Sequence, residues 1–169
     1  MSQAQRTYIA KADLQSMGMD DFLDMDLDAV QLLAPKKVLP RGKYAFVGGT
    51  VDVVEIGQDK NSGIALPFKL TGLIEMLNPE DTLPEDIEWP IDVVVNCQLE
   101  NDKDGNGKRR LRTLTEGYAV PNGLKTGAER IARFEGMTGV LELNVETYTR
   151  SDKSVATYNS INPFTVIYN

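Results

Sequence analysis

The chain has 169 residues, of which 41% are hydrophobic and 25% are charged, and its formal net charge is −7. This composition is that of an ordinary globular protein, and the length fits one domain with a hydrophobic core, or one domain plus an ordered arm. No apolar run approaches the ~18 residues that a membrane span requires. Because the sequence contains no histidine, Ser-His-Asp catalysis and most zinc sites are excluded.

The only cysteine, Cys97, lies in the apolar run IDVVVNCQLE. We predict a buried and unreactive thiol, since no histidine is present to activate it. A single cysteine also fits a reducing cytoplasm. We therefore expect a protein that is not an enzyme, with no catalytic residue, no cofactor and no metal.

The acidity is concentrated near the N-terminus. Residues 1–35 hold six acids and two bases, for a net charge of −4, whereas residues 36–169 hold 19 acids and 16 bases. Apolar residues are interleaved with the aspartates between Met17 and Leu33, so this stretch is an amphipathic acidic segment whose pattern fits both a helix and an extended peptide. Prolines then bracket the basic stretch PKKVLPRGK, which predicts a linker. The expected organisation is an arm over 1–35 and a domain over 36–169.

The domain begins with a series of predicted strands. KYAFVGGTVDVVEI changes the parity of its apolar residues at Gly48-Gly49, which indicates a bulge or sharp bend in one long strand. IALPFKLTGLIEML is a second strand with Ile64, Leu66, Phe68 and Leu70 on one face, and IDVVVNCQLE is a third.

The next segment, NDKDGNG (101–107), resembles the beginning of a calcium loop but lacks the closing glutamate and flanking helices. It is predicted to be a polar hairpin turn. KRRLRTLTEGYAV is then expected as a fourth strand or a ragged strand edge.

The sequence from Leu124 to Gly136 is the one helix expected in the body, with Gly136 as its stop. Two final strands, TGVLELNVETYTR and VATYNSINPFTVIY, are expected to form a hairpin around 151–154. A bent first strand, a meander, one helix and a closing hairpin favour an all-β body of OB-like small-barrel type. A two-sheet sandwich is the competing architecture.

Basic and aromatic residues provide the candidate binding site. Tyr148 and Arg150 have the parity opposite to the core series of their strand, and Tyr158 has the outward parity of the next one, so the two rings are predicted to be neighbours on one outer face. Exposed rings beside cations are what a single-stranded nucleic-acid groove requires; the alternative is a solvated charged face with half-buried tyrosines. The predicted nucleic-acid-binding residues are Lys43, Lys69, Lys108, Arg109, Arg110, Arg112, Tyr148, Arg150 and Tyr158.

Several sequence segments resemble those of phage single-stranded DNA-binding proteins. They are LDMDLDAV, LPRGKYAFVGG, SGIALPFKLTGLIEMLNPED and FEGMTGVLELNVETYTRSDKSVATYNSINPF. The resemblance covers most of residues 27–164 and is one of layout and short phrases, without a signature motif. It implies an OB fold and non-sequence-specific binding of single-stranded DNA. It also implies a role in phage DNA replication or recombination in the cytoplasm of the infected cell.

Proteins of that type usually carry an acidic C-terminal tail that recruits partner proteins, whereas this sequence ends in NPFTVIYN. We expect the N-terminal acidic segment to take that role, or to occlude the DNA groove, or only to pack on the barrel. Self-association and contacts with phage replication or recombination proteins are the expected interactions. The predicted partner-binding residues are Asp20, Asp21, Phe22, Asp24, Asp26 and Asp28.

The sequence also fits a second hypothesis. The chain could be a structural or interaction protein of the phage particle, such as a decoration or head-tail component, in which the N-terminal arm locks a β-barrel to its neighbours.

Overall fold

The computed structural model describes Asp26, Asp28 and residues 38–169. The chain divides into the units Met1–Lys36 and Lys37–Asn169. Apart from two of its aspartates, the predicted acidic arm lies outside the described residues. No helix among residues 38–169 is long and apolar enough to cross a membrane.

The described body consists of strands, two helices and a short 3-10 turn. In chain order the elements are β1 (Gly42–Gly48), β2 (Asp52–Ile56), β3 (Asn61–Met76), β4 (Ile91–Gln98), α3 (Asn106–Ala119), α4 (Gly127–Phe134), β5 (Thr138–Thr149), β6 (Val155–Ile161), η2 (Pro163–Thr165) and β7 (Ile167–Tyr168).

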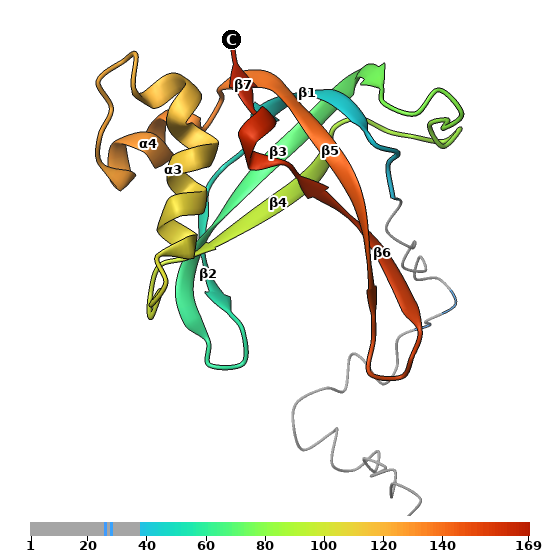
Figure 1. The fold of residues 1–169 in the computed structure, drawn as a ribbon, viewed down its shortest axis with the longest axis horizontal. Coiled ribbons are helices and arrows are strands. Elements are labelled where there is room, and N and C mark those ends of the chain that lie inside the picture. Colours follow the sequence, from blue (N-terminus) through green and yellow to red (C-terminus); the bar gives the residue numbers. More distant parts are fainter. Residues whose placement is uncertain (1–25, 27, 29–37) are drawn as a thin grey trace, which may run out of the picture. The chain divides into compact units, whose positions relative to one another are not determined.

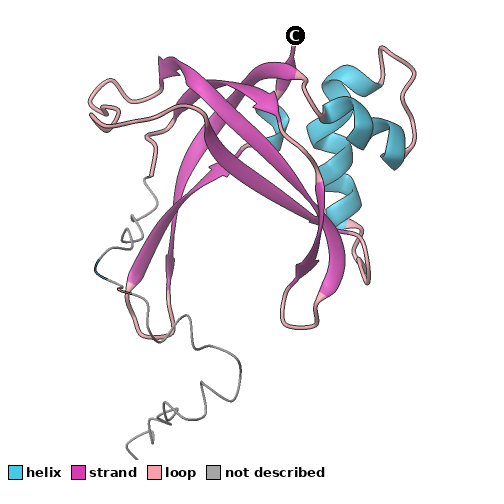
Figure 2. Cartoon of the chain, turned by 180° about the vertical axis from the view of Figure 1, so that it is seen from behind, coloured by secondary structure: helices cyan, strands magenta, loops and turns pink. Residues whose placement is uncertain are grey.

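The strands form one curled antiparallel sheet in the order β2-β3-β1-β5-β6, with β4 paired to β3 and β7 paired to β5. Figure 1 shows this sheet as a half-barrel in which β3 and β4 cross the β5–β6 hairpin. In the view from behind, the two helices stand together at one side of the sheet (Figure 2). The predicted mostly-β body with a barrel-like sheet is thus confirmed.

The core follows the predicted alternation of β3. Ile64, Leu66, Phe68 and Leu70 are all buried, and they meet residues from β1, β4, β5 and both helices. The ring of Phe68 packs edge-on against Phe46 and Phe134, with centroid distances of 5.1 and 5.0 Å. Aromatic pairs in this geometry add to the free energy gained from burial alone.

The predicted break in the first strand is present. β1 ends at Gly48 and β2 begins at Asp52, and both segments pair with β3. A Cβ atom on Gly48 would lie 2.1 Å from the carbonyl oxygen of Phe134, so only glycine allows the end of α4 to approach the strand this closely.

The strand predicted after the polar turn was wrong. Residues 101–105 form a turn, but it leads into a helix instead of forming a hairpin. KRRLRTLTEGYAV lies almost entirely in α3, which gives the body a second helix. Two side-chain oxygens of Asp102 accept the backbone N–H groups of Gly107 and Lys108 at 3.1 Å each, which satisfies donors that the start of a helix leaves unpaired.

Helix α4 confirms the expected helix in the body, within shorter bounds. It has a capping box in which Thr126 and Glu129 satisfy each other's backbone N–H groups. Beyond its end, Gly136 has a φ of 84°, which fits its predicted role as the stop.

Cys97 is fully buried, as predicted. Burial raises the pKa of its thiol to about 11, so the reactive thiolate is scarce at neutral pH.

Candidate nucleic-acid interface

The β5–β6 hairpin presents two tyrosines side by side. Tyr148 pairs with Ala156 and Tyr158 pairs with Glu146, so the two rings are diagonal neighbours on one face. Their centroids lie 5.7 Å apart with an interplanar angle of 64°. Tyr148 is 51% exposed and Tyr158 is 43% exposed. The predicted juxtaposition of these rings is therefore confirmed.

One cation and one anion accompany the rings. The guanidinium of Arg150 lies 5.9 Å from the centroid of Tyr148, within the range of a cation–π contact. On the other side, a hydrogen bond to the carboxylate of Glu146 raises the pKa of Tyr158. Because the two charges cancel, this tyrosine cluster offers flat apolar surface rather than net positive charge.

The hairpin holds this geometry through its turn and its alternation. The inward positions of β5 include Leu141 and Leu143, which are fully buried, and this fixes Tyr148 on the opposite face. In the turn, the carboxylate of Asp152 accepts the backbone N–H of Ser154 at 2.9 Å and its hydroxyl at 2.6 Å. These hydrogen bonds lower the pKa of Asp152, so the turn keeps them at neutral pH.

The densest group of predicted cations lies on α3, and all four of its side chains are exposed. Arg110 donates to the carbonyl oxygen of Asn96 at 2.9 Å, and Arg112 forms an ion pair with Glu116 at 3.5 Å. Lys108 and Arg109 form no ion pair with any described residue. Solvent-facing cations of this kind are available to phosphate groups.

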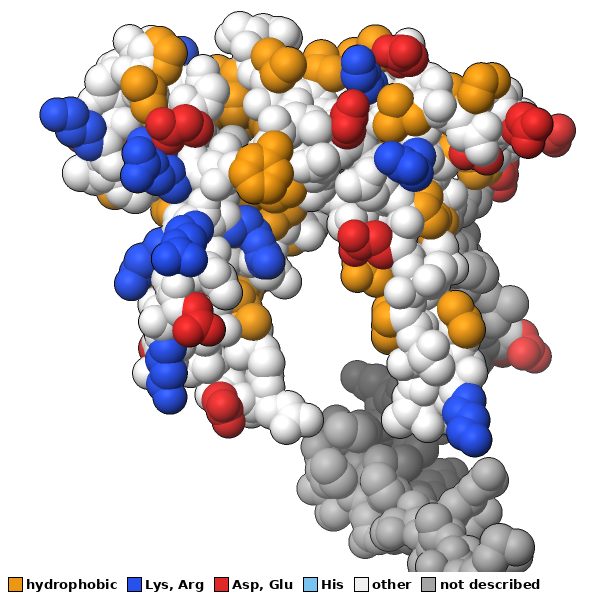
Figure 3. All heavy atoms as spheres, in the orientation of Figure 1, with side chains coloured by type: hydrophobic (Ala, Val, Ile, Leu, Met, Phe, Trp, Pro, Cys, Tyr) orange, Lys and Arg blue, Asp and Glu red, His pale blue; other side chains and the backbone are white. Residues whose placement is uncertain are grey.

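Charge is strongly segregated along the described chain. The helical segment, residues 106–134, holds seven bases and two acids, for a net charge of +5. The remainder, residues 38–105 and 135–169, holds seven bases and 17 acids, for −10. Figure 3 shows Lys and Arg side chains gathered on the side of the molecule that carries the helices. An acidic protein therefore still presents one cationic region.

Two predicted cations lie apart from this region. Lys43 and Lys69 have the outward parity on β1 and β3, so they lie on the outer face of the sheet. Lys43 forms an ion pair with Glu75 at 3.4 Å, and Lys69 is paired in register with Asp92. The structure does not bring these lysines together with α3 or with the tyrosine cluster, and acids lie next to both.

One exposed aromatic residue was missed in the sequence. Phe164, in η2, is 87% exposed, and its backbone N–H donates to the side chain of Asn162 at 3.1 Å. The turn that carries it contacts both α3 and β5. The sequence signal was the combination Asn-Pro-Phe, in which asparagine caps a short helical turn that begins with proline.

The elements that carry these side chains lie on two sides of an opening in the molecule. Figures 1 and 3 show an opening between the side formed by α3 and the β2–β3 turn and the side formed by the β5–β6 hairpin. The helical segment lies on one side of this opening and the β5–β6 hairpin on the other, and η2 contacts both α3 and β5.

The predicted partner-binding residues lie outside the described residues except for Asp26 and Asp28, which are exposed. No model of a known protein family matches this sequence, and no curated protein is significantly similar to it.

Proposed function

We propose that this protein binds single-stranded DNA without sequence preference. The observation that carries the proposal is the exposed Tyr148–Tyr158 pair with Arg150 against it. Aromatic side chains on which bases stack, combined with cations that follow the backbone, are the means by which single strands are bound regardless of sequence.

The strand connections support an OB-like barrel as the framework. In the OB fold, a bent first strand pairs with the second and fourth strands, a helix precedes the fourth, and the last two form a hairpin. Here β1 and β2 pair with β3, β1 also pairs with β5, and α3 and α4 precede β5. OB folds bind oligonucleotides on the face of their second and third strands and with the loops of the first and last hairpins. Those loops correspond to the β2–β3 and β5–β6 turns.

Affinity has two sources in this proposal. The tyrosine cluster stacks bases, at about 1–3 kcal/mol for each base. Cations of α3 neutralise phosphates and release counterions, so this part of the affinity falls as the salt concentration rises. The body's net negative charge repels DNA elsewhere, which confines binding to the helical segment and the hairpin.

The sequence resemblance adds a biological setting to the proposal. On this basis the protein acts in phage DNA replication or recombination in the cytoplasm of an infected cell, self-associates and contacts other replication or recombination proteins. The acidic segment of residues 20–28 is the proposed contact for such partners.

A mobility-shift experiment tests the proposed activity. We expect a 30-nucleotide single strand to be shifted by micromolar protein at ~50 mM salt and released as salt is raised. Duplex of the same sequence, whose bases are not free to stack on tyrosine, should bind more weakly. An unshifted single strand at low salt would contradict the proposal.

A second candidate is a structural or interaction protein of the phage particle. It is favoured by Phe164 and Ile167, which are 87% and 68% exposed near the C-terminus, since exposed apolar side chains mark protein contacts. Absence of DNA binding together with a defined assembly in sedimentation would favour this second function.

A further inference from the structure

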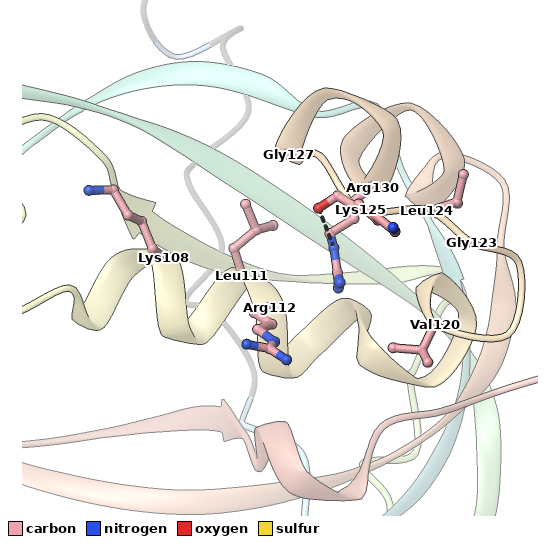
Figure 4. A pocket seen from close by; sticks show the side chains of 9 residues that line it. All are labelled: Lys108, Leu111, Arg112, Val120, Gly123, Leu124, Lys125, Gly127 and Arg130. Carbon is pink, nitrogen blue, oxygen red and sulfur yellow. Dashed lines mark hydrogen bonds between the residues drawn. The ribbon is translucent and has the colours of Figure 1, made fainter.

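A pocket of about 490 Å³ lies between α3 and α4, away from the tyrosine cluster. Figure 4 shows α3 forming one wall, and α4 with the loop that precedes it forming the other. Its volume falls in the range of small-molecule sites. The lining residues are Lys108, Leu111, Arg112, Val120, Gly123, Leu124, Lys125, Gly127 and Arg130.

The polar part of the lining is entirely cationic. Four of its residues carry a positive charge and none carries a negative one. Lys108 and Lys125 form no ion pair with any residue in the described part of the chain, and Arg112 is partly neutralised by Glu116. The site therefore favours an anion, and the two lysines are the cations most available to it.

Arg130 gives this wall a fixed shape. Its side chain is 10% exposed, and it donates to the hydroxyl of Thr115 at 2.8 Å and to the carbonyl oxygen of Lys125 at 3.4 Å. The hydroxyl of Tyr118 donates to the carbonyl oxygen of Arg130. These contacts join α3 to α4 and hold the backbone of Lys125 beside the pocket. A preformed site costs less conformational entropy on binding.

The remaining lining is apolar or lacks a side chain. Leu111, Val120 and Leu124 provide aliphatic surface, and two glycines leave room beside it. A bare inorganic anion would use only the cations. A ligand with a phosphate and a flat, weakly polar ring system would use both parts of the lining.

From this combination we infer that the α3–α4 pocket binds a nucleoside monophosphate unit, with the phosphate held by cations of the lining and the base against the aliphatic side chains. Two sources share this chemistry: a free nucleotide, and the phosphorylated end of a bound DNA strand. Only the second source depends on the proposed function.

The test is a titration of the full chain with dTMP, thymidine and inorganic phosphate. Binding is measured by isothermal titration calorimetry and by the chemical shifts of the backbone amides. We expect dTMP to bind and to shift the amides of Leu111, Leu124 and Lys125. Thymidine and phosphate should each bind about ten-fold or more weakly, since each lacks one half of the contacts.

Paired variants show whether the pocket is responsible. Lys108→Ala combined with Lys125→Ala should weaken dTMP binding about ten-fold or more through lost charge-assisted hydrogen bonds and leave the melting temperature unchanged. Arg133→Ala, an exposed cation of α4 outside the lining, is the matched control and should bind as the wild type. Absence of dTMP binding at millimolar concentration, or equal losses in both variants, would overturn the inference.

A third arm separates the two sources. A short single strand with a terminal phosphate is compared with the same strand ending in hydroxyl groups. If the wild type prefers the phosphorylated strand and the double lysine variant loses this preference, the ligand of the pocket is the strand end. If dTMP binds but the wild type shows no such preference, the ligand is a free nucleotide. If no strand binds while dTMP does, the proposed function fails and the pocket stands.

Discussion

The helical segment and the β5–β6 hairpin differ in what they offer to a nucleic acid. The helical segment carries a net charge of +5 and exposes cations, whereas the hairpin exposes two tyrosines with one cation and one anion beside them. In the proposed function, electrostatic attraction and base stacking come from different elements of one fold. We therefore expect separate variants to remove the two contributions, and a series of salt concentrations to distinguish them.

The largest effect is expected from the hairpin. Combining Tyr148→Ala with Tyr158→Ala should weaken single-strand binding by about five-fold or more for each ring, since each stacked base is worth about 1–3 kcal/mol. The loss should persist at high salt, because stacking does not depend on counterions. Fluorescence anisotropy with a labelled oligonucleotide measures it.

Thr157→Ala serves as the control for this hairpin. Thr157 is exposed on β6 but has the parity opposite to that of the tyrosines. A wild-type melting temperature in the double tyrosine variant is required. If that variant loses its thermal transition, the rings stabilise the fold and the stacking assignment is wrong.

The cations of α3 should give a smaller loss, and only at low salt. Lys108→Ala combined with Arg109→Ala is expected to reduce the slope of log K against log salt by about 1.4, at ~0.7 for each phosphate contact of a single strand. Anisotropy measured over a range of salt concentrations gives the slope. The control is Lys43→Ala, which removes a cation paired to Glu75 and should leave the slope nearly unchanged. Equal slopes in the two variants would show that α3 is not part of the interface.

A variant of Phe164 tests whether one DNA strand contacts both the hairpin and the helical segment. Phe164→Ala should cost up to one stacked base, about 1–3 kcal/mol, if the strand passes over η2 between the hairpin and α3. Because the side chain is almost fully exposed, the melting temperature should hardly change. Wild-type DNA affinity combined with reduced self-association in sedimentation would assign Phe164 to a protein contact.

The smallest effect concerns the anchoring of α3. Hydrogen bonds from Gly107 and Lys108 lower the pKa of Asp102 below its ordinary value of 3.8. A carboxylate with a lowered pKa in the folded state stabilises the protein above its unfolded pKa, and this contribution is lost as pH falls below that value. Asp102→Asn keeps at most one of the two acceptors, so we expect a slightly lower melting temperature at neutral pH and a weaker dependence on acid pH.

The hairpin was predictable from the sequence and α3 was not, because the two segments differ in how clearly their apolar residues show a period. Along β5 and β6 one parity is apolar near the core and the other carries both tyrosines, so period-two alternation alone fixes which side chains meet. In RRLRTLTEGYAV, Leu111 and Leu114 alternate loosely with polar residues and imitate a strand edge. The helical spacing of Leu111, Leu114 and Tyr118 was the better signal.

The glycines before α3 also misled the sequence interpretation. Gly105 and Gly107 suggested a hairpin turn, yet a Cβ atom on Gly107 would lie 1.8 Å from the carbonyl oxygen of Gln98. That glycine is required because the start of the helix packs directly on β4. Such an approach, and the grouping of Lys108 with Lys125 around one pocket, depend on tertiary packing that a single sequence does not display.

We propose that one DNA strand contacts both the hairpin and the helical segment. Ultraviolet cross-linking to an oligonucleotide carrying bromouracil, followed by mass spectrometry of the peptides, tests it most directly. We predict cross-links at Tyr148 or Tyr158 and, on the same oligonucleotide, at Phe164 or within residues 106–134. Cross-links confined to the outer face of β1 and β3, around Lys43 and Lys69, would contradict it.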